Sequence, residues 1–581
     1  MQTIKVIFKN IFTLSGKIII VGLISLFAVS CSKNEETITT APTAAGETVL
    51  TFTVNDITDP RIEKVATTSA ARTSEAPRSK LLQFKDGGFD AFLAISQGPI
   101  TGKSAEQYTS SKNNSQNGLK VAAKMPTTTK YRILLYNEQN TILKKEIEVQ
   151  SGETPKITVD AGVKYNWYAV STNEGSAPTV TNGVIDKAAL ANKDVLYAKG
   201  SITPQFGMDN QIPITFRHLN IAYSINLDAR GVFGAINPET QIKFPSGDNV
   251  IFTGDLNILS GTYSNQTAIP ASSLTSNMTT TMSSPKNGDA VVKNAIFYSS
   301  QGRSFNSNEF SVTFSPLNIK LYDEPLPKIY DSRTYPFANS FTTEAGNQYN
   351  ITVELTQSGT IINGNIVWAS ANLMYNQSGG LYQYYFRTNN AYVDVDPNEF
   401  WGWKSSTPDG FQNIIDPCVR VQPLNTWRMP SSAEFEAIRN EFSEQYVEQT
   451  PSPGIFGAAA SLFVSRAYIA WQWRFGKTAS IASEFLLSKP TTLILPFNGK
   501  LEYNTFSGQY SSQEQPSTIF AGFGNVGGVG YYWTSDSYTY RKLQFSSTFF
   551  NALTSASFVS GSTPANFEAS SRFNIRCVRD N

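Results

Sequence analysis

The side chains that most often carry nucleophilic or metal chemistry are scarce in this chain, which has three cysteines and one histidine. The cysteines are Cys31, Cys418 and Cys577, and the histidine is His218. A Ser-His-Asp triad would have to recruit His218, which lies in an alternating stretch predicted to be a sandwich strand. The sequence therefore argues against histidine-dependent catalysis and against a histidine-rich metal site. We predict no catalytic residue, no metal ion and no cofactor.

Cys31 closes a segment with the layout of an export signal. Lys5, Lys9 and Lys17 precede an apolar stretch at 18–29, and small residues lead into the cysteine. This order of basic, apolar and small residues is typical of a secretory signal peptide. The apolar stretch is shorter than the roughly 20 residues that a membrane-spanning helix needs. The simpler alternative is a secretory signal in which the cysteine is incidental.

The run Leu-Phe-Ala-Val-Ser-Cys that ends at Cys31 resembles the signal of bacterial lipoproteins. The resemblance implies a signal peptide at 1–30 and a Cys31 that carries lipid, such as palmitate, at the start of the mature chain. Lys33, followed by two glutamates, resembles the export signal of Bacteroidota lipoproteins displayed outside the outer membrane. It implies a surface-exposed lipoprotein of the cell outer membrane. Residues 31–48 lack apolar periodicity, so we predict a flexible tether there.

Composition favours a β-rich extracellular protein. The chain has 581 residues, 16% of them charged, and a net charge of +1. Its length allows about three or four domains, and its charge indicates no nucleic-acid partner. If Cys31 carries lipid, Cys418 and Cys577 remain as an even pair in an oxidising compartment.

Two long stretches show the alternation of short strands. Leu50, Phe52 and Val54 alternate with threonines, and further alternating runs continue to Val170. Polar turns separate these runs, which predicts a β-sandwich at 49–195. A second series of alternating residues runs from Ile212 to Leu355. It predicts another sandwich at 196–360.

The order of motifs in these two units resembles the fimbrillin family of Bacteroidota lipoproteins. The motifs are the lipoprotein signal, TFTV, an Arg-Thr loop, YNWYAVS, and DVLYA followed by ITFRHL. The resemblance implies two tandem transthyretin-like β-sandwiches. In that family, an arginine-specific protease removes the first strand and subunits then polymerise by strand exchange. Arg72 and Arg78 follow the strand at 50–54 and are the candidate processing sites, with an ordinary exposed loop as the alternative.

The last 200 residues contain a different set of motifs. DPC, TWRMPSSAEFEAI, GYYWTS and IRCVRD resemble the FISUMP-type domain, a relative of C-type-lectin-like and formylglycine-generating-enzyme-like folds. The resemblance implies an α+β domain at 361–581, with Cys418 and Cys577 in a disulfide between the start of the domain and its last strand. Two free thiols at a metal or catalytic site are the alternative. Ser431 and Glu434 form a capping box, which predicts a helix just after Pro430.

Two features of this domain are candidates for ligand binding. Residues 394–399 begin like a calcium-binding EF-hand loop but lack its glycine and final glutamate, so we predict a turn. Aromatic clusters could present rings to a sugar or a protein, although such clusters more often form a core. The candidate contacts are Trp401, Trp403, Tyr532 and Trp533.

These observations lead to one functional hypothesis and two alternatives. We predict a non-enzymatic, surface-anchored fimbrillin-like lipoprotein, serving as a fimbrial tip or accessory subunit or as an adhesin. Its partners would be the outer membrane, other fimbrial subunits through strand exchange, and a glycan or protein ligand. The first alternative is a non-polymerising carbohydrate-binding lipoprotein for glycan capture. The second is an enzyme of the formylglycine-generating type, which would require reduced Cys418 and Cys577.

Overall fold

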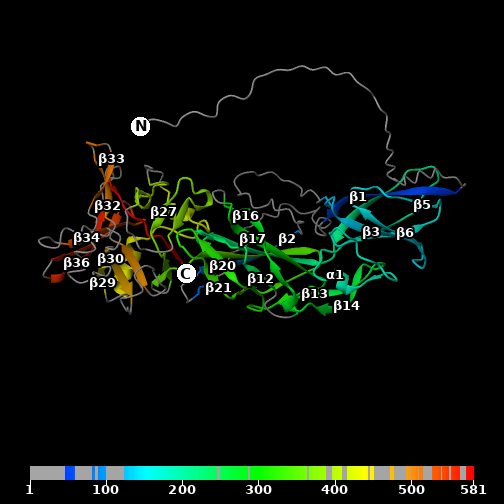
Figure 1. Cartoon of the computed structure of the whole chain (residues 1–581), viewed down its shortest axis with the longest axis horizontal. Helices are drawn as coiled ribbons and strands as arrows, with labels where there is room; N and C mark the ends of the chain where they lie inside the picture. The colour runs from blue at the N-terminus through cyan, green and yellow to red at the C-terminus, as the bar shows by residue number, and fades with distance from the viewer. Residues whose placement is uncertain are drawn as a thin grey trace, which may run out of the picture.

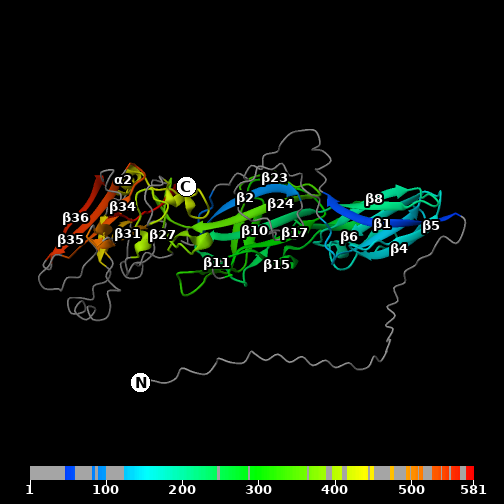
Figure 2. The same cartoon turned by 90° about the horizontal axis from the view of Figure 1, so that it is seen from above.

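The structure is a computed structural model in which strands predominate. It describes residues 46–58, 81–84, 89–99, 124–244, 249–284, 288–362, 365–387, 396–408, 415–441, 445–449, 471–476, 492–496, 499–504, 506–507, 509–513, 526–537, 539–548, 551–562 and 571–580. Figures 1 and 2 show three β-rich regions in a row along the longest axis, which we name the N-terminal, middle and C-terminal regions. The predicted mainly β fold class is confirmed.

The N-terminal region is built on one seven-stranded sheet. In sheet order its strands are β4 (Leu143–Gln150), β3 (Lys130–Asn137), β6 (Tyr165–Ser171), β8 (Leu196–Ile202), β9 (Asn210–His218), β1 (Glu47–Thr58) and β5 (Lys156–Asp160). Alternation explains its burial: every second side chain of β9 is buried, as expected for a strand with one face on a core. That core includes Phe52, Trp167 and Phe216 and draws apolar residues from all seven strands.

A small sheet covers part of the other face of this large sheet. It consists of β14 (Thr262–Ala268), β13 (Phe252–Asn257) and β7 (Val184–Ile185), and the short helix α1 (Lys187–Leu190) contacts β13. Tyr168 and Tyr197 of the large sheet pack here against Leu256 and Ile258. The two faces of the large sheet therefore bury two separate apolar clusters.

The middle region is a sandwich with one large core. Its larger sheet contains, in order, β16 (Thr279–Ser283), β17 (Ala290–Ser299), β10 (Ile221–Gly231), β24 (Asn347–Gln357) and β2 (Phe89–Pro99). Its shorter strands are β11 (Gly234–Ile236), β20 (Leu317–Leu321), β21 (Lys328–Tyr330), β15 (Thr275–Asn277), β12 (Gln241–Lys243), β19 (Ser311–Phe314), β22 (Arg333–Pro336), β18 (Ser304–Phe305) and β23 (Phe341–Thr342). Tyr223 and Ile351 of the larger sheet share one apolar cluster with Phe314 and Ile319 of the shorter strands.

Strand pairing crosses the predicted boundaries of the two sandwiches in two places. β8 and β9 complete the N-terminal sheet, although the sequence placed 196–360 in the second sandwich. β2 falls within 49–195 but pairs along its whole length with β24 of the middle region. The chain therefore leaves the N-terminal region after β1, adds an edge strand to the middle region and returns at β3. Alternation identifies a strand but does not identify its partner, which explains the difference.

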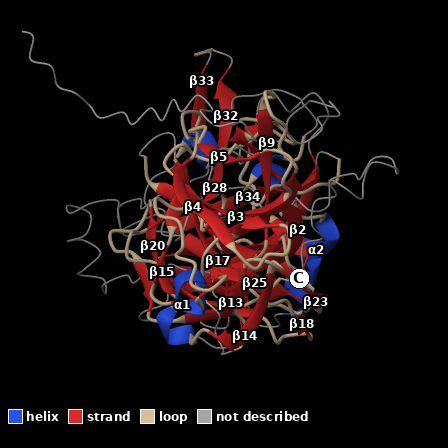
Figure 3. Ribbon diagram, turned by 90° about the vertical axis from the view of Figure 1, so that its right-hand side faces the viewer, coloured by secondary structure: helices blue, strands red, loops and turns tan. Residues whose placement is uncertain are grey.

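The C-terminal region consists of short sheets and helices around an aromatic core. Its strands are β25 (Thr360–Ile362), β26 (Ile366–Trp368), β27 (Leu373–Tyr375), β28 (Tyr384–Phe386), β29 (Gln445–Gln449), β30 (Trp471–Gly476), β31 (Thr492–Pro496), β32 (Lys500–Asn504), β33 (Gln509–Gln513), β34 (Val526–Trp533), β35 (Thr539–Thr548), β36 (Asn551–Ser562), β37 (Ser571–Arg572) and β38 (Val578–Asp580). Its helices are α2 (Ser432–Glu441) and the 3-10 helices η3 (Gly380–Tyr382), η4 (Pro397–Glu399) and η5 (Pro417–Arg420). In Figure 3, viewed along the long axis, α1 and α2 lie at the edge of the strands. None of the helices in the described part of the chain is long and apolar enough to cross a membrane.

Candidate functional site

Strand β1 occupies a position from which it contacts two strands at once. It runs antiparallel to β5 and parallel to β9, so that Leu50 lies opposite Ile157 on one side and Asn210 on the other. Leu50 and Phe52 are fully buried in the core of the N-terminal region. Phe52 meets the ring of Trp167 edge to face, with 6.3 Å between the ring centres. Burying each of these two apolar side chains contributes about 1.5–3 kcal/mol.

Polar contacts fix the register of β1 at both of its ends. Near the start, Asn210 Nδ2 donates to Thr48 Oγ1 at 2.9 Å, and Thr48 Oγ1 donates to the Gln205 carbonyl at 3.2 Å. At the end, Thr58 Oγ1 donates to the carbonyl of Phe216 at 3.3 Å. A strand that replaced β1 would therefore need apolar residues at alternate positions and polar residues at its ends.

The covalent connection of β1 to the rest of the fold passes through residues 59–88. β1 ends at Thr58, and the described chain resumes at Leu81 before it enters β2 of the middle region. The candidate processing residues Arg72 and Arg78 fall between these points and lie outside the described residues, as does the candidate lipidation site Cys31. A cut after either arginine would leave β1 attached to the downstream chain by non-covalent contacts alone.

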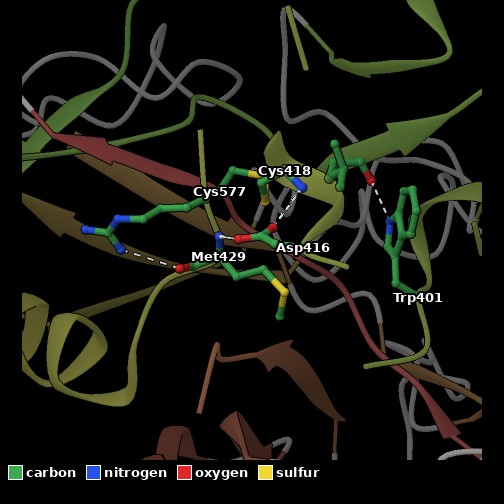
Figure 4. The surroundings of a disulfide bond; sticks show 7 residues. Trp401, Asp416, Cys418, Met429 and Cys577 are labelled. Carbon is green, nitrogen blue, oxygen red and sulfur yellow. Dashed lines mark hydrogen bonds between the residues drawn. A yellow bond between two sulfur atoms is a disulfide. The ribbon is translucent and has the colours of Figure 1, made fainter. Parts of the chain in front are cut away.

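The disulfide between Cys418 and Cys577 lies in the core of the C-terminal region, with both residues fully buried (Figure 4). Asp416 organises the chain beside it. Its Oδ1 accepts a hydrogen bond from Cys418 N at 2.9 Å, and its Oδ2 accepts one from Met429 N at 2.7 Å. Burial raises the pKa of the Asp416 carboxyl, and these two backbone donors oppose that shift. A buried, oxidised cysteine pair offers no thiolate for catalysis.

The four aromatic residues predicted as ligand contacts are core residues instead. Trp401, Trp403, Tyr532 and Trp533 are all buried. The indole N–H groups of the three tryptophans donate to backbone carbonyls: Trp401 Nε1 to Leu373 O at 3.0 Å, Trp533 Nε1 to Trp401 O at 2.7 Å and Trp403 Nε1 to Thr534 O at 2.9 Å. This corrects the ligand-contact prediction: the four rings are buried in the core, where large aromatic side chains contribute most to stability, and are not available to a ligand.

The predicted capping box forms at the start of α2. Glu434 N donates to Ser431 Oγ at 3.2 Å, and Ser431 N donates to Glu434 Oε2 at 2.7 Å. Arg428 adds a two-pronged ion pair, with distances of 2.6 and 2.9 Å to the two carboxylate oxygens. Burial acts to raise the pKa of Glu434, but the hydrogen bonds from Arg428 and Ser431 outweigh it and lower the pKa. The Trp-Arg-Met-Pro motif thus positions a helix.

His218 and Asp396 also make structural contacts, and residues 394 and 395 of the predicted turn lie outside the described residues. His218 Nδ1 lies 2.7 Å from Asp194 Oδ1, and both residues are buried at the end of β9. Asp396 caps η4 by accepting from Asn398 N at 2.9 Å. Among the described residues, no group of three or more His, Cys, Asp and Glu side chains is placed to hold a metal ion.

A buried ion pair joins the middle and C-terminal regions, and sequence reasoning did not find it. Arg579 Nη2 of β38 lies 2.7 Å from Asp90 Oδ2 of β2, with side chains 1% and 4% exposed. Ser358 Oγ donates to the other Asp90 oxygen at 2.8 Å. Burial raises the pKa of Asp90, and the charge of Arg579 opposes that shift. A lone aspartate carries no signal in the sequence of such a distant partner.

Aromatic side chains extend this junction. Tyr385 of β28 stacks on Phe233 of the middle region, with 3.7 Å between the ring centres. The Tyr382 hydroxyl donates to the carbonyl of Gly234, and its ring packs beside Val291 and Val292. The C-terminal region is therefore held against the middle region by buried charge, stacking and hydrogen bonds together.

Comparisons with known proteins found a family model and several solved structures that are similar to part of this chain. A search of the curated proteins found no match. Among solved structures, the chain is similar to a candidate cell adhesion protein from Bacteroides fragilis (12% identity, 45% of this chain and 93% of that one, TM-score 0.26). It is also similar to the fimbrial anchor protein Mfa2 from Porphyromonas gingivalis (12% identity, 34% and 72%, TM-score 0.20). Residues 108–367, which include every strand from β3 to β25, match the family model described as Fimbrillin-like.

Proposed function

We propose that this chain is a surface-anchored fimbrillin-like lipoprotein that serves as a fimbrial tip or accessory subunit, or as an adhesin, and binds its ligand through the C-terminal region. The observation that carries the proposal is the position of β1. This strand lies between β5 and β9 and buries apolar side chains in the core, yet its covalent connection to the downstream fold runs through residues 59–88. The match of residues 108–367 to the fimbrillin model supports the same role.

Loss of β1 would create a binding site for a strand. β5 and β9 would each expose an unpaired edge, and the core around Trp167 would open where Leu50 and Phe52 had been. An extended segment of another subunit that carried apolar residues at alternate positions would restore both edges and the core, which is recognition by strand addition. We infer that processing after Arg72 or Arg78 prepares the chain to accept such a strand.

The C-terminal region supports a terminal place in an assembly. β38 is paired with β26, Cys577 is tied to Cys418, and Arg579 is paired with Asp90. These contacts commit residues 577–580 to the chain's own fold, so they are not available as a donor strand for another subunit. A chain that accepts a strand and keeps this segment folded fits a tip or accessory position.

N-terminal mapping of protein recovered from the cell surface tests the proposal. We expect a lipidated start at Cys31 in membrane-held copies and a start just after Arg72 or Arg78 in copies within fimbriae. A double substitution Arg72→Ala and Arg78→Ala should retain the Cys31 start and remain outside fimbriae. The matched control, Lys64→Ala and Lys80→Ala, removes equal charge from the same segment and should be processed normally. If every copy starts at Cys31 and none joins a polymer, the non-polymerising carbohydrate-binding lipoprotein replaces our proposal.

A further inference from the structure

A cavity of about 530 Å³ lies in the C-terminal region beside its junction with the middle region. Tyr375, Asn376, Gln377 and Ser378 line it from β27 and the turn that follows, and Tyr385, Asp396 and Asn398 line it from β28 and η4. Gln377, Ser378 and Asn398 are exposed and the other four are half-buried, so the cavity is open to solvent. Its volume falls within the range of about 300–1,000 Å³ that is typical of small-ligand sites.

The chemistry of the lining narrows the class of ligand. Among the described lining residues, three carboxamides, one hydroxyl and two phenols supply both donors and acceptors, and Asp396 supplies a carboxylate. None of the described lining residues is cationic, which disfavours phosphate, sulfate and carboxylate ligands. The polar lining also disfavours an acyl chain. A neutral polyhydroxylated molecule, with hydroxyl groups for the amides and an apolar ring face for tyrosine, matches this lining best.

Hydrogen bonds and stacking hold the lining in place. Asp396 accepts from Asn398 Nδ2 at 2.9 Å and from Arg387 Nη2 at 3.1 Å. Asn376 Oδ1 accepts from Ser378 Oγ at 3.1 Å. Phe233 of the middle region covers one face of the Tyr385 ring. A site that is rigid before binding loses less conformational entropy when the ligand arrives.

Several polar groups of the lining still have capacity for a ligand. Within the described residues, the Tyr385 hydroxyl and the Gln377 carboxamide have no hydrogen-bond partner, and Asn376 Nδ2 has none either. Burial raises the pKa of Tyr385 to about 12, so its phenol is neutral at physiological pH and can both donate and accept. Polar groups that converge on an open cavity without partners are what a hydroxylated ligand would satisfy.

We propose that this cavity binds a neutral saccharide unit of a glycan. The proposal rests on the adhesin role proposed above and gives that role a site and a ligand class. The site also differs from the predicted one, because Trp401, Trp403, Tyr532 and Trp533 are core residues and the cavity is lined by tyrosines and amides.

Binding of the full chain to an immobilised panel of neutral oligosaccharides, each with its sialylated or sulfated counterpart, tests the proposal. We expect binding to at least one neutral oligosaccharide. Tyr385→Phe keeps the ring stacked on Phe233 and removes one hydrogen bond, so it should weaken the affinity about 2- to 10-fold without shifting the unfolding midpoint. Gln377→Ala should weaken the affinity by a similar factor.

Tyr503→Phe and Gln509→Ala are the matched controls, because both residues are exposed on β32 and β33 and neither lines the cavity. They should leave the affinity unchanged. Failure to bind any neutral oligosaccharide would overturn the proposal, as would preference for the anionic counterparts or equal effects of the control and cavity variants. The readout is independent of fimbrial assembly: a chain that binds but stays outside fimbriae refutes only the proposed polymerisation, and one that assembles without binding refutes only this inference.

Discussion

Asp90 and Arg579 form a buried ion pair 2.7 Å long across 489 residues of sequence. Asp90 lies near the start of β2. This strand follows β1 in the chain but forms an edge of the larger sheet of the middle region. Arg579 lies in β38, at the end of the C-terminal region. Arg579 also lies over the ring of Trp427, with 5.0 Å from its guanidinium carbon to the ring centre. The pair therefore links β2, the first strand of the middle region, to β38, the last strand of the C-terminal region.

Neutralising one partner of this pair should be strongly destabilising. Asp90→Asn leaves the Arg579 charge buried without its counter-charge, and breaking a buried pair in this way typically costs about 3–5 kcal/mol. We expect the double variant Asp90→Asn/Arg579→Met to be less destabilised than the single variant, because it buries no uncompensated charge. Thermal and denaturant unfolding of the full chain would measure both.

The control for this experiment is the exposed pair between Lys164 and Glu138, whose side chains are 46% and 52% exposed. Glu138→Gln should cost less than about 1 kcal/mol, since exposed pairs contribute little. An Asp90→Asn variant no less stable than Glu138→Gln would show that the pair does not hold the two regions together.

Local patterns predicted several strands and one helix of this fold, whereas the partners of the strands depend on contacts that no local pattern contains. Alternation at Leu50, Phe52 and Val54 predicted β1, and the Ser431–Glu434 capping box predicted α2. The same alternation in β2 gave no sign that its partner is β24. A period of two fixes which side chains share a face, but pairing between distant strands is decided by the whole core.

The site in the C-terminal region shows the same limit. Trp401 and Trp533 are candidate ligand contacts by sequence, because large aromatic residues are common in binding sites. In the structure their indole N–H groups donate to buried backbone carbonyls. The cavity is instead lined by Tyr375 and by Tyr385, which belongs to an aromatic cluster that no local pattern distinguishes from the clusters of the core. The two tyrosines meet Asp396 only because β27, β28 and η4 come together in space.

Glu399 should make the stability of the C-terminal region depend on pH. Its carboxyl is buried 3.4 Å from Arg387 Nε, and burial raises its pKa to about 7 although Arg387 opposes the shift. The folded state therefore holds this proton more tightly than the unfolded state, whose pKa is near 4.5. The free energy of unfolding should fall as the pH rises between these two values, by about 3 kcal/mol in all.

Unfolding midpoints measured from pH 5 to pH 8.5 at constant ionic strength check this prediction. Glu399→Gln should flatten the profile, because the amide does not titrate. Glu148→Gln is the control: a hydrogen bond from Lys130 lowers the pKa of Glu148, so its titration falls below this pH window. If the Glu399→Gln and wild-type profiles have the same slope above pH 5, Glu399 is not the group that responds.

The disulfide should be a large source of stability and should leave no reactive thiol. Cys418 and Cys577 are 159 residues apart, and closing a loop of that length stabilises by about 5 kcal/mol in the chain-entropy model. We expect the double variant Cys418→Ser/Cys577→Ser to unfold at a markedly lower temperature than the wild type. Alkylation followed by mass spectrometry should label neither cysteine until the protein is reduced. Labelling of both cysteines in the native, unreduced protein would instead support the alternative of an enzyme of the formylglycine-generating type.

The position of β1 between β5 and β9 leads to the most direct prediction about assembly. After cleavage at Arg72 or Arg78, the β1 fragment should stay bound, because Leu50 and Phe52 remain in the core. Phe52→Ala should reduce the free energy of binding of the β1 fragment by about 3–5 kcal/mol, because it leaves a cavity in the core. The cleaved variant should then lose the fragment at a lower temperature and exchange faster with an added synthetic peptide of residues 46–58.

Asn55→Ala is the control for this exchange, since Asn55 is exposed on the same strand. It should leave the exchange rate of the cleaved protein near that of the wild type. Peptide uptake that is equally fast in Phe52→Ala, Asn55→Ala and wild type would mean that core contacts do not limit the departure of β1. The rate of strand replacement would then be set by something other than the core contacts of β1, such as an approaching subunit that opens the edges of β5 and β9.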